Sequence, residues 1–208
     1  MKKLLLILLC LPMIGFGQNL AIGDLYQGGI IFYLDGNGGG LISSLLNQSE
    51  AAEWGCNGTY ITGTAYGIGT GSQNTISIQN GCPNSGTAAD ICADLVLNGY
   101  NDWYLPSAAE WELMIANIGP YSALGNVGGY STTSGGGPEM YYWSSSQSTS
   151  NPTTWAYRYN MDLNNLAINY GTKYQNSKVR AIRSFVSSVS GCTDATACNY
   201  NASANVDD

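Results

Sequence analysis

Residues 102–119 read Asp-Trp-Tyr-Leu-Pro-Ser-Ala-Ala-Glu-Trp-Glu-Leu-Met-Ile-Ala-Asn-Ile-Gly, and this stretch decides the predicted fold. Ser107 and Glu110 have the spacing of a capping box, in which each side chain accepts the backbone N–H of the other residue. An apolar stripe follows at helical spacing, made of Trp111, Met114, Ile115 and Ile118. Gly119 and Pro120 then stop the run, so the stretch predicts an amphipathic helix over 107–118.

A second helix is predicted upstream, beginning at Thr87. Asp90 lies three residues after Thr87 and complements the helix dipole. The apolar positions recur at helical spacing as far as Gly99, at Ala88, Ile91, Cys92, Leu95 and Val96. Residues 55–86 show no sustained periodicity, so we expect a long loop there. A disulfide between Cys56 and Cys82 would pin that loop.

Strand patterns flank the two helices. Gly29–Leu34 and Gly40–Ile42 are short apolar runs separated by an Asp-Gly turn, which predicts a β-hairpin. After a glycine-rich loop over 119–138, four runs typical of strands follow: 142–146, 155–162, 166–170 and 179–185. The predicted fold is therefore α+β, with an N-terminal hairpin, two helices, long Gly-rich loops and a C-terminal antiparallel sheet. We expect the hairpin to join or flank that sheet.

The N-terminus has the plan of a secretory signal peptide. Lys2 and Lys3 precede an apolar run that is too short to span about 30 Å of hydrocarbon, so we predict cleavage after residue 17. Loss of the two lysines takes the formal net charge from −7 to −9. Such acidity disfavours nucleic acid and membrane partners. The predicted organisation is signal peptide 1–17, domain 18–186, linker 187–191 and a small Cys- and Asp-rich tail module 192–208.

The composition argues against common catalytic sites. The chain has no histidine, which excludes a Ser-His-Asp arrangement and makes a zinc site a poor prediction. Five cysteines remain after the leader, so at least one thiol has no partner within the chain. Cys92 falls on the buried helix face and is expected to be an inert thiol. We predict no enzyme, and a carboxylate-based hydrolase is the less favoured alternative.

Three ordered blocks resemble a known family. They are Asp102-Trp103-Tyr104-Leu105-Pro106-Ser107 with Glu110, then Tyr142-Trp143-Ser144-Ser145-Ser146, then Val179-Arg180-Ala181-Ile182-Arg183. Over about residues 22–186 the chain resembles the family of the C-terminal domain of the bacterial collagen-like adhesin Lcl, long catalogued as a domain of unknown function. The resemblance implies a C-type-lectin-like fold and adhesion at a cell surface. Tyr104 stands where that family usually has Arg, which would remove a buried ion pair.

The tail carries a second resemblance. It is similar to a Gly-Cys-Thr-Asp repeat of secreted and surface proteins from Bacteroidetes-type bacteria. The closing Gly-Ser-Cys of that repeat is missing here. This difference implies a truncated repeat.

The segment from Trp143 to Tyr174 concentrates aromatic and Asn side chains, a composition typical of carbohydrate sites and antibody paratopes. We therefore predict a secreted or surface-displayed, noncatalytic module that binds an extracellular glycan or a protein. A diversified binding protein on a C-type-lectin scaffold is an alternative. The candidate ligand-binding residues are Trp143, Trp155, Tyr157, Arg158, Tyr159, Asn160, Asp162, Asn164, Asn165, Asn169, Tyr170 and Tyr174.

Two questions about this segment stay open at the level of sequence. The alternating aromatics also fit the core face of a sheet, and in that case Arg158, Asn160, Asp162 and the loop 163–175 become the better candidates. We predict no cofactor, but Asp162 with neighbouring Asn carbonyls offers the oxygen ligands that Ca²⁺ accepts.

Overall fold

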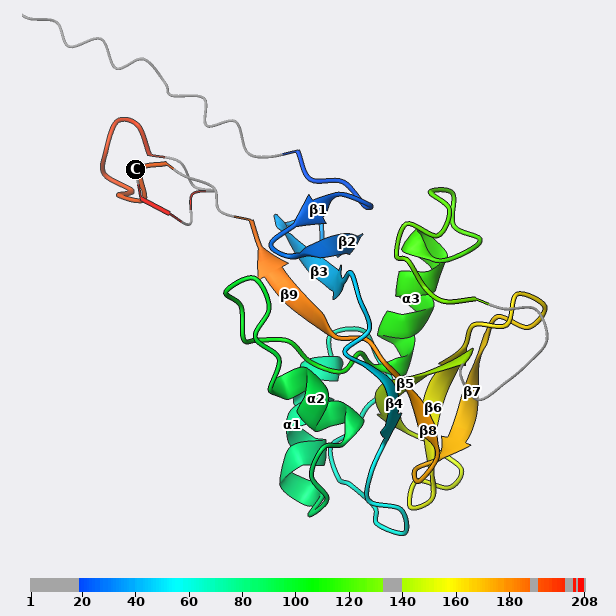
Figure 1. The fold of residues 1–208 in the computed structure, drawn as a ribbon. Helices are drawn as coiled ribbons and strands as arrows, with labels where there is room; N and C mark the ends of the chain where they lie inside the picture. The colour runs from blue at the N-terminus through cyan, green and yellow to red at the C-terminus, as the bar shows by residue number, and fades with distance from the viewer. Residues whose placement is uncertain (1–18, 133–139, 188–190, 201–203, 205, 208) are drawn as a thin grey trace, which may run out of the picture.

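The computed structural model describes residues 19–132, 140–187, 191–200, 204 and 206–207. These residues form an α+β structure with three helices and two sheets, most of whose strands pair antiparallel (Figure 1). The helices are α1 Gly71–Gly81, α2 Ala88–Ala93 and α3 Ala108–Ile118. The strands are β1 Leu25–Tyr26, β2 Gly29–Leu34, β3 Gly39–Ser44, β4 Ser49–Glu53, β5 Tyr141–Gln147, β6 Trp155–Asn160, β7 Ala167–Thr172, β8 Asn176–Val179 and β9 Ile182–Val186.

The strands divide into a four-stranded sheet of order β1-β2-β3-β9 and a five-stranded sheet of order β4-β8-β5-β6-β7. The predicted hairpin is confirmed as β2 and β3. Its turn is held by Asp35, whose carboxylate accepts the backbone N–H groups of Asn37 and Gly39. β9 pairs with β3, so the start and the end of the domain meet in one sheet, as the sequence predicted.

The prediction of one C-terminal antiparallel sheet is wrong in two respects. The run 179–185 is not a single strand, because the chain leaves the five-stranded sheet after β8 and enters the other sheet as β9 (Figure 1). Arg180 and Ala181 make this crossing. In addition, β8 pairs with β5 in parallel.

Helix α3 begins and ends where the sequence placed it, and its capping box is present. Its apolar stripe packs against Tyr142 and Tyr159, forming one core cluster together with the hairpin. A second core cluster lies around Trp143 and includes residues of α1 and α2. Because Tyr142 and Trp143 are consecutive residues of β5, that strand is buried on both of its faces.

Helix α1 lies in the segment predicted to be a loop, so that prediction is wrong. Its N-cap residue Thr70 makes no side-chain cap bond, and no acidic residue stands in its first turn. Tertiary contacts hold it instead. The buried Asn74 side chain accepts the Ala65 N–H at 2.7 Å and donates to Ser145 Oγ at 3.1 Å. Such contacts override weak local propensity.

The disulfide between Cys56 and Cys82 is confirmed, and it closes the segment that contains α1. The capping box of Thr87 and Asp90 is also present, but α2 ends at Ala93, earlier than predicted. Cys92 is buried as expected, and burial raises the pKa of its thiol well above the ordinary range.

The predicted signal peptide 1–17 lies outside the described residues, as does most of the predicted linker. Figure 1 shows the tail as a small loop beyond the end of β9. Within it, Asp207 accepts hydrogen bonds from the N–H and hydroxyl groups of Thr193. Among the described residues, no helix combines the length and the apolar character that crossing a membrane requires.

Candidate functional site

Strand β6 presents two different surfaces. Successive side chains of a strand point to opposite faces, so Trp155, Tyr157 and Tyr159 share one face and Arg158 lies on the other. The neighbouring strand β7 continues this division, since Tyr170 lies opposite Tyr157 and Asn169 lies opposite Arg158. The candidate residues of the sequence therefore belong to two separate surfaces.

The first surface carries a row of contacting rings that we call the aromatic strip: Trp155, Tyr170, Tyr157 and Tyr66. The rings of Trp155 and Tyr170 are nearly parallel, with centroids 6.0 Å apart. Tyr157 contacts Tyr170 at 4.9 Å and Tyr66 at 5.1 Å. Trp155 is 37% exposed and Tyr170 is 42% exposed, whereas Tyr157 is buried beneath them. One end of the strip is therefore open to a ligand.

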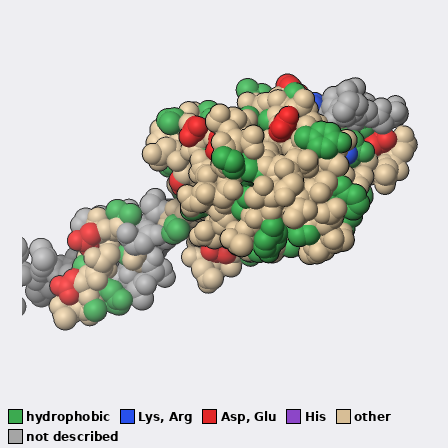
Figure 2. All heavy atoms as spheres, turned by 90° about the horizontal axis from the view of Figure 1, so that it is seen from below, with side chains coloured by type: hydrophobic (Ala, Val, Ile, Leu, Met, Phe, Trp, Pro, Cys, Tyr) green, Lys and Arg blue, Asp and Glu red, His purple; other side chains and the backbone are tan. Residues whose placement is uncertain are grey.

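Three loops meet beside that open end. The Gly58 N–H donates to Thr153 O, and the Gly55 N–H donates to Lys173 O. The buried Lys173 ammonium donates to Thr59 O at 2.8 Å. These bonds place Tyr60 and Tyr174, which are 57% and 58% exposed, on loops next to the strip. From below, hydrophobic side chains group within a mostly neutral polar surface with few charged groups (Figure 2).

Lys173 is a structural feature of this region. Its ammonium also donates to Gln147 Oε1 at 2.7 Å and lies 4.4 Å from the centre of the Trp54 ring. Burial lowers the pKa of Lys173 to about 8. The side chain therefore holds the loops together and contributes no exposed charge.

Besides Tyr157, three of the predicted ligand-binding residues are buried. Trp143 has no exposed surface, and its indole N–H donates to Ala52 O at 2.8 Å. Tyr159 stacks on Trp111 beneath α3. The Asn160 side chain accepts the Asp162 N–H. The buried Trp143 and Tyr159 match the core alternative that the sequence left open. Asn160 does not, because that alternative placed it outward and its side chain is buried. We leave all three residues out of the proposed site.

The second surface holds Arg158. Its guanidinium lies 3.7 Å from the centre of the Tyr141 ring. Asn169 lies opposite Arg158 in the sheet, and its Oδ1 accepts the N–H of Tyr170. The arginine therefore belongs to a small polar surface that is distinct from the aromatic strip.

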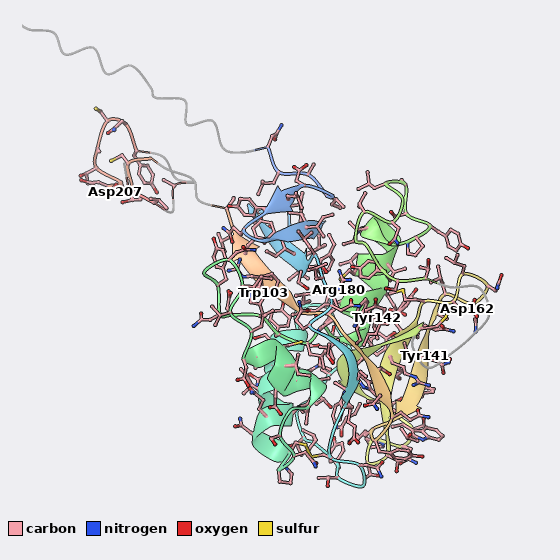
Figure 3. The ribbon with its side chains drawn as sticks, viewed as in Figure 1. Trp103, Tyr141, Tyr142, Asp162, Arg180 and Asp207 are labelled. Carbon is pink, nitrogen blue, oxygen red and sulfur yellow. A yellow bond between two sulfur atoms is a disulfide. The ribbon has the colours of Figure 1, made fainter. Side chains whose placement is uncertain are left out.

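The calcium prediction gains no support. Asp162 lies at the periphery, beyond the end of β6 (Figure 3), and its carboxylate accepts the Asn164 N–H. The backbone N–H of Asn165 also donates a hydrogen bond to the backbone carbonyl of Asp162. In the part of the chain that the structure describes, no group of three or more His, Cys, Asp or Glu side chains could hold a metal ion. Asp162, Asn164 and Asn165 form a turn.

The charged residues of the sequence blocks serve the fold. Arg180 lies at the centre of the molecule (Figure 3) and donates to Asn47 Oδ1, Ser44 O and Gly128 O. Arg183 makes a two-pronged ion pair with Asp102. Glu110 is buried, and its two carboxylate oxygens accept the N–H groups of Gly69 and Ser107. Because burial is the largest influence on Glu110, its pKa is raised.

Sequence reasoning missed two residues of these surfaces. Tyr66 stands in the segment taken for a featureless loop, and only the packing of that loop on β6 brings it to Tyr157. Tyr141 stands one residue before the predicted strand 142–146. The available signal was that it extends this run by one residue; in the structure it belongs to β5 and lies opposite Asn160 of β6.

Comparison with known proteins adds nothing to these observations. No protein-family model matches the chain, and no curated protein matches it. The resemblance of the three sequence blocks to the Lcl C-terminal family stays a prediction. The geometry of the two surfaces is therefore the basis for assigning a function.

Proposed function

We propose that the chain is an exported, noncatalytic binding module that recognises a neutral glycan through the aromatic strip. The open end of the strip, formed by Trp155 and Tyr170, is the observation that supports this function. Flat aromatic rings give apolar contact area at a low cost in conformational entropy. The neighbouring loops 148–154 and 172–176 are rich in Ser, Thr, Asn and Gln, which supply hydrogen bonds to hydroxyl groups.

The distribution of charge favours a neutral ligand. Of the five cations that follow the leader, four are buried: Lys173, Lys178, Arg180 and Arg183. A surface that binds sulfated polymers needs clustered exposed cations. The net charge of −9 after leader removal adds repulsion to such ligands.

The absence of catalysis is part of the proposal. The carboxylates of Glu110 and Asp90 are both engaged in capping boxes. A glycosidase uses two carboxyl groups that flank the scissile bond. The adhesion role and the C-type-lectin-like fold belong to the proposal too, and the sequence blocks together with the α+β architecture support them.

A glycan array tests the proposal, with the wild-type chain, Trp155→Ala and Tyr200→Ala compared with and without calcium. Tyr200 is the matched control because it is a 46% exposed aromatic residue of the tail. We expect the wild type and Tyr200→Ala to bind the same neutral glycans without calcium. Trp155→Ala should lose at least about tenfold in affinity, because it removes the flat indole surface on which a sugar ring packs. Binding by no glycan, or turnover of one, contradicts the proposal.

A further inference from the structure

Arg158 differs from the other four cations of the exported chain. Lys178 pairs with Glu50, and Arg183 pairs with Asp102. Lys173 and Arg180 donate to several carbonyl and amide oxygens. Among the described residues, Arg158 forms no ion pair, and its buried Nε has no hydrogen-bond partner. A guanidinium normally donates up to five hydrogen bonds. Arg158 therefore carries unused hydrogen-bonding capacity.

The surroundings hold this guanidinium in place. It lies 3.7 Å from the centre of the Tyr141 ring and 5.8 Å from that of Trp143. Gly171 on the adjacent strand leaves the space that the side chain occupies, because a Cβ there would approach Arg158 Nε to 2.8 Å. Stacking on an aromatic ring restrains the planar group, and its edge stays free to donate.

A pocket opens at this position. Its volume is about 480 Å³, and it is lined by Tyr141, Arg158, Gln175 and Asn176. That volume falls within the range of pockets that hold small molecules. Tyr141 is the first residue of β5, the strand between β8 and β6, and the two amide side chains come from the start of β8 and the residue before it.

The chemistry of the pocket matches one class of ligand. The fork of a guanidinium fits a carboxylate through two parallel N–H···O bonds. A single cation suits a single negative charge rather than a polyanion. Gln175 and Asn176 both donate and accept hydrogen bonds, which suits the hydroxyl groups of a sugar. Glu53 lies opposite Asn176 in the sheet, and it forms no ion pair with Arg158.

We propose that this pocket, the Arg158 pocket, binds the carboxylate of a sugar acid such as glucuronate. Arg158 receives the carboxylate, and the two amides contact the hydroxyl groups. The site is independent of the aromatic strip because Arg158 and Tyr157 point to opposite faces of β6. A uronic acid at this pocket and a neutral glycan at the strip are separate binding events.

Titration of the full chain with glucuronate, followed by NMR of the Gln175 and Asn176 amide side chains, tests the proposal. Glucose and the methyl ester of glucuronate are the matched neutral probes. We expect glucuronate to shift these signals saturably and the neutral probes to bind at least about tenfold more weakly, a difference of about 1.4 kcal/mol. Equal binding of glucuronate and its methyl ester overturns the proposal. An equally strong response to an acidic peptide overturns the assignment to sugar acids.

Variants separate this site from the aromatic strip. Arg158→Gln should weaken glucuronate binding at least about tenfold, and Arg158→Lys should weaken it because an ammonium lacks the planar fork. Trp155→Ala should bind glucuronate as the wild type does, even if no neutral glycan binds the strip. Unchanged glucuronate affinity in a folded Arg158→Gln variant overturns the proposal. If that variant fails to unfold cooperatively, the comparison of glucuronate with its methyl ester on the wild type still tests the proposal.

Discussion

Replacement of Asn74 by Ala should destabilise the protein through the contacts that hold α1. The variant loses the bond from the Ala65 N–H at 2.7 Å, the bond to Ala65 O at 2.6 Å and the bond to Ser145 Oγ at 3.1 Å. Each contributes about 0.5–1.5 kcal/mol net. The higher helix propensity of Ala offsets about 0.5 kcal/mol of this loss. We therefore expect the free energy of unfolding to fall by about 2 kcal/mol.

Urea denaturation and thermal unfolding followed by circular dichroism measure this change, and a loss of about 2 kcal/mol corresponds to about 4–8 °C in Tm for a chain of this size. Gln73→Ala is the matched control, because Gln73 is an exposed neighbour whose side-chain contact is 3.5 Å long. Hydrogen exchange should also accelerate over α1 in Asn74→Ala. If the two variants agree within about 0.5 kcal/mol, α1 is not held by Asn74 and the reasoning is refuted.

Three further changes probe the buried charged groups. Arg180→Met leaves Ser44 O and Gly128 O without their buried donor, so it should lower the free energy of urea unfolding by about 2–4 kcal/mol; a loss below about 1 kcal/mol contradicts its bridging role. Glu110→Gln replaces one of two accepting oxygens by an amide donor, so it should cost about 1–3 kcal/mol in the same assay, and an unchanged midpoint would show that its cap is dispensable. Because burial lowers the pKa of Lys173 to about 8, the unfolded chain binds more protons above that pH, and the stability of the wild type relative to Lys173→Met should rise between pH 7.5 and 9.5. A constant difference between those two proteins would contradict the lowered pKa.

The helices show what local sequence can and cannot predict. Helix α3 carries its own signals, since Ser107 and Glu110 cap it and its apolar stripe matches the helical period. Helix α1 carries none of them, and Asn74 has a partner only because Ser145 of β5 lies beside it in the fold. The crossing between β8 and β9 was missed for a similar reason. The alternating pattern of residues 179–185 continues through Arg180. The change of sheet is marked instead by the hydrogen bonds of Arg180 to distant loops.

The candidate site was predicted as a segment but not as a surface. The alternation of aromatic and polar residues in 155–162 correctly predicted a strand with two unlike faces. It could not show that Tyr159 lies beneath α3 while Trp155 reaches the solvent, because that depends on where α3 ends across the sheet. It also could not show that Tyr141 stacks on Arg158, since this contact joins two strands.

Acrylamide quenching of the intrinsic tryptophan fluorescence tests the central proposal most directly. Four of the five tryptophans, namely Trp54, Trp103, Trp111 and Trp143, are at most 2% exposed, so the quenchable emission comes from Trp155. Saturation with the neutral glycan that binds most tightly on the array should protect the Trp155 emission from quenching by acrylamide. Trp155→Phe should lack the quenchable component even without glycan. A bound glycan that leaves the quenching of Trp155 unchanged would contradict recognition through the aromatic strip.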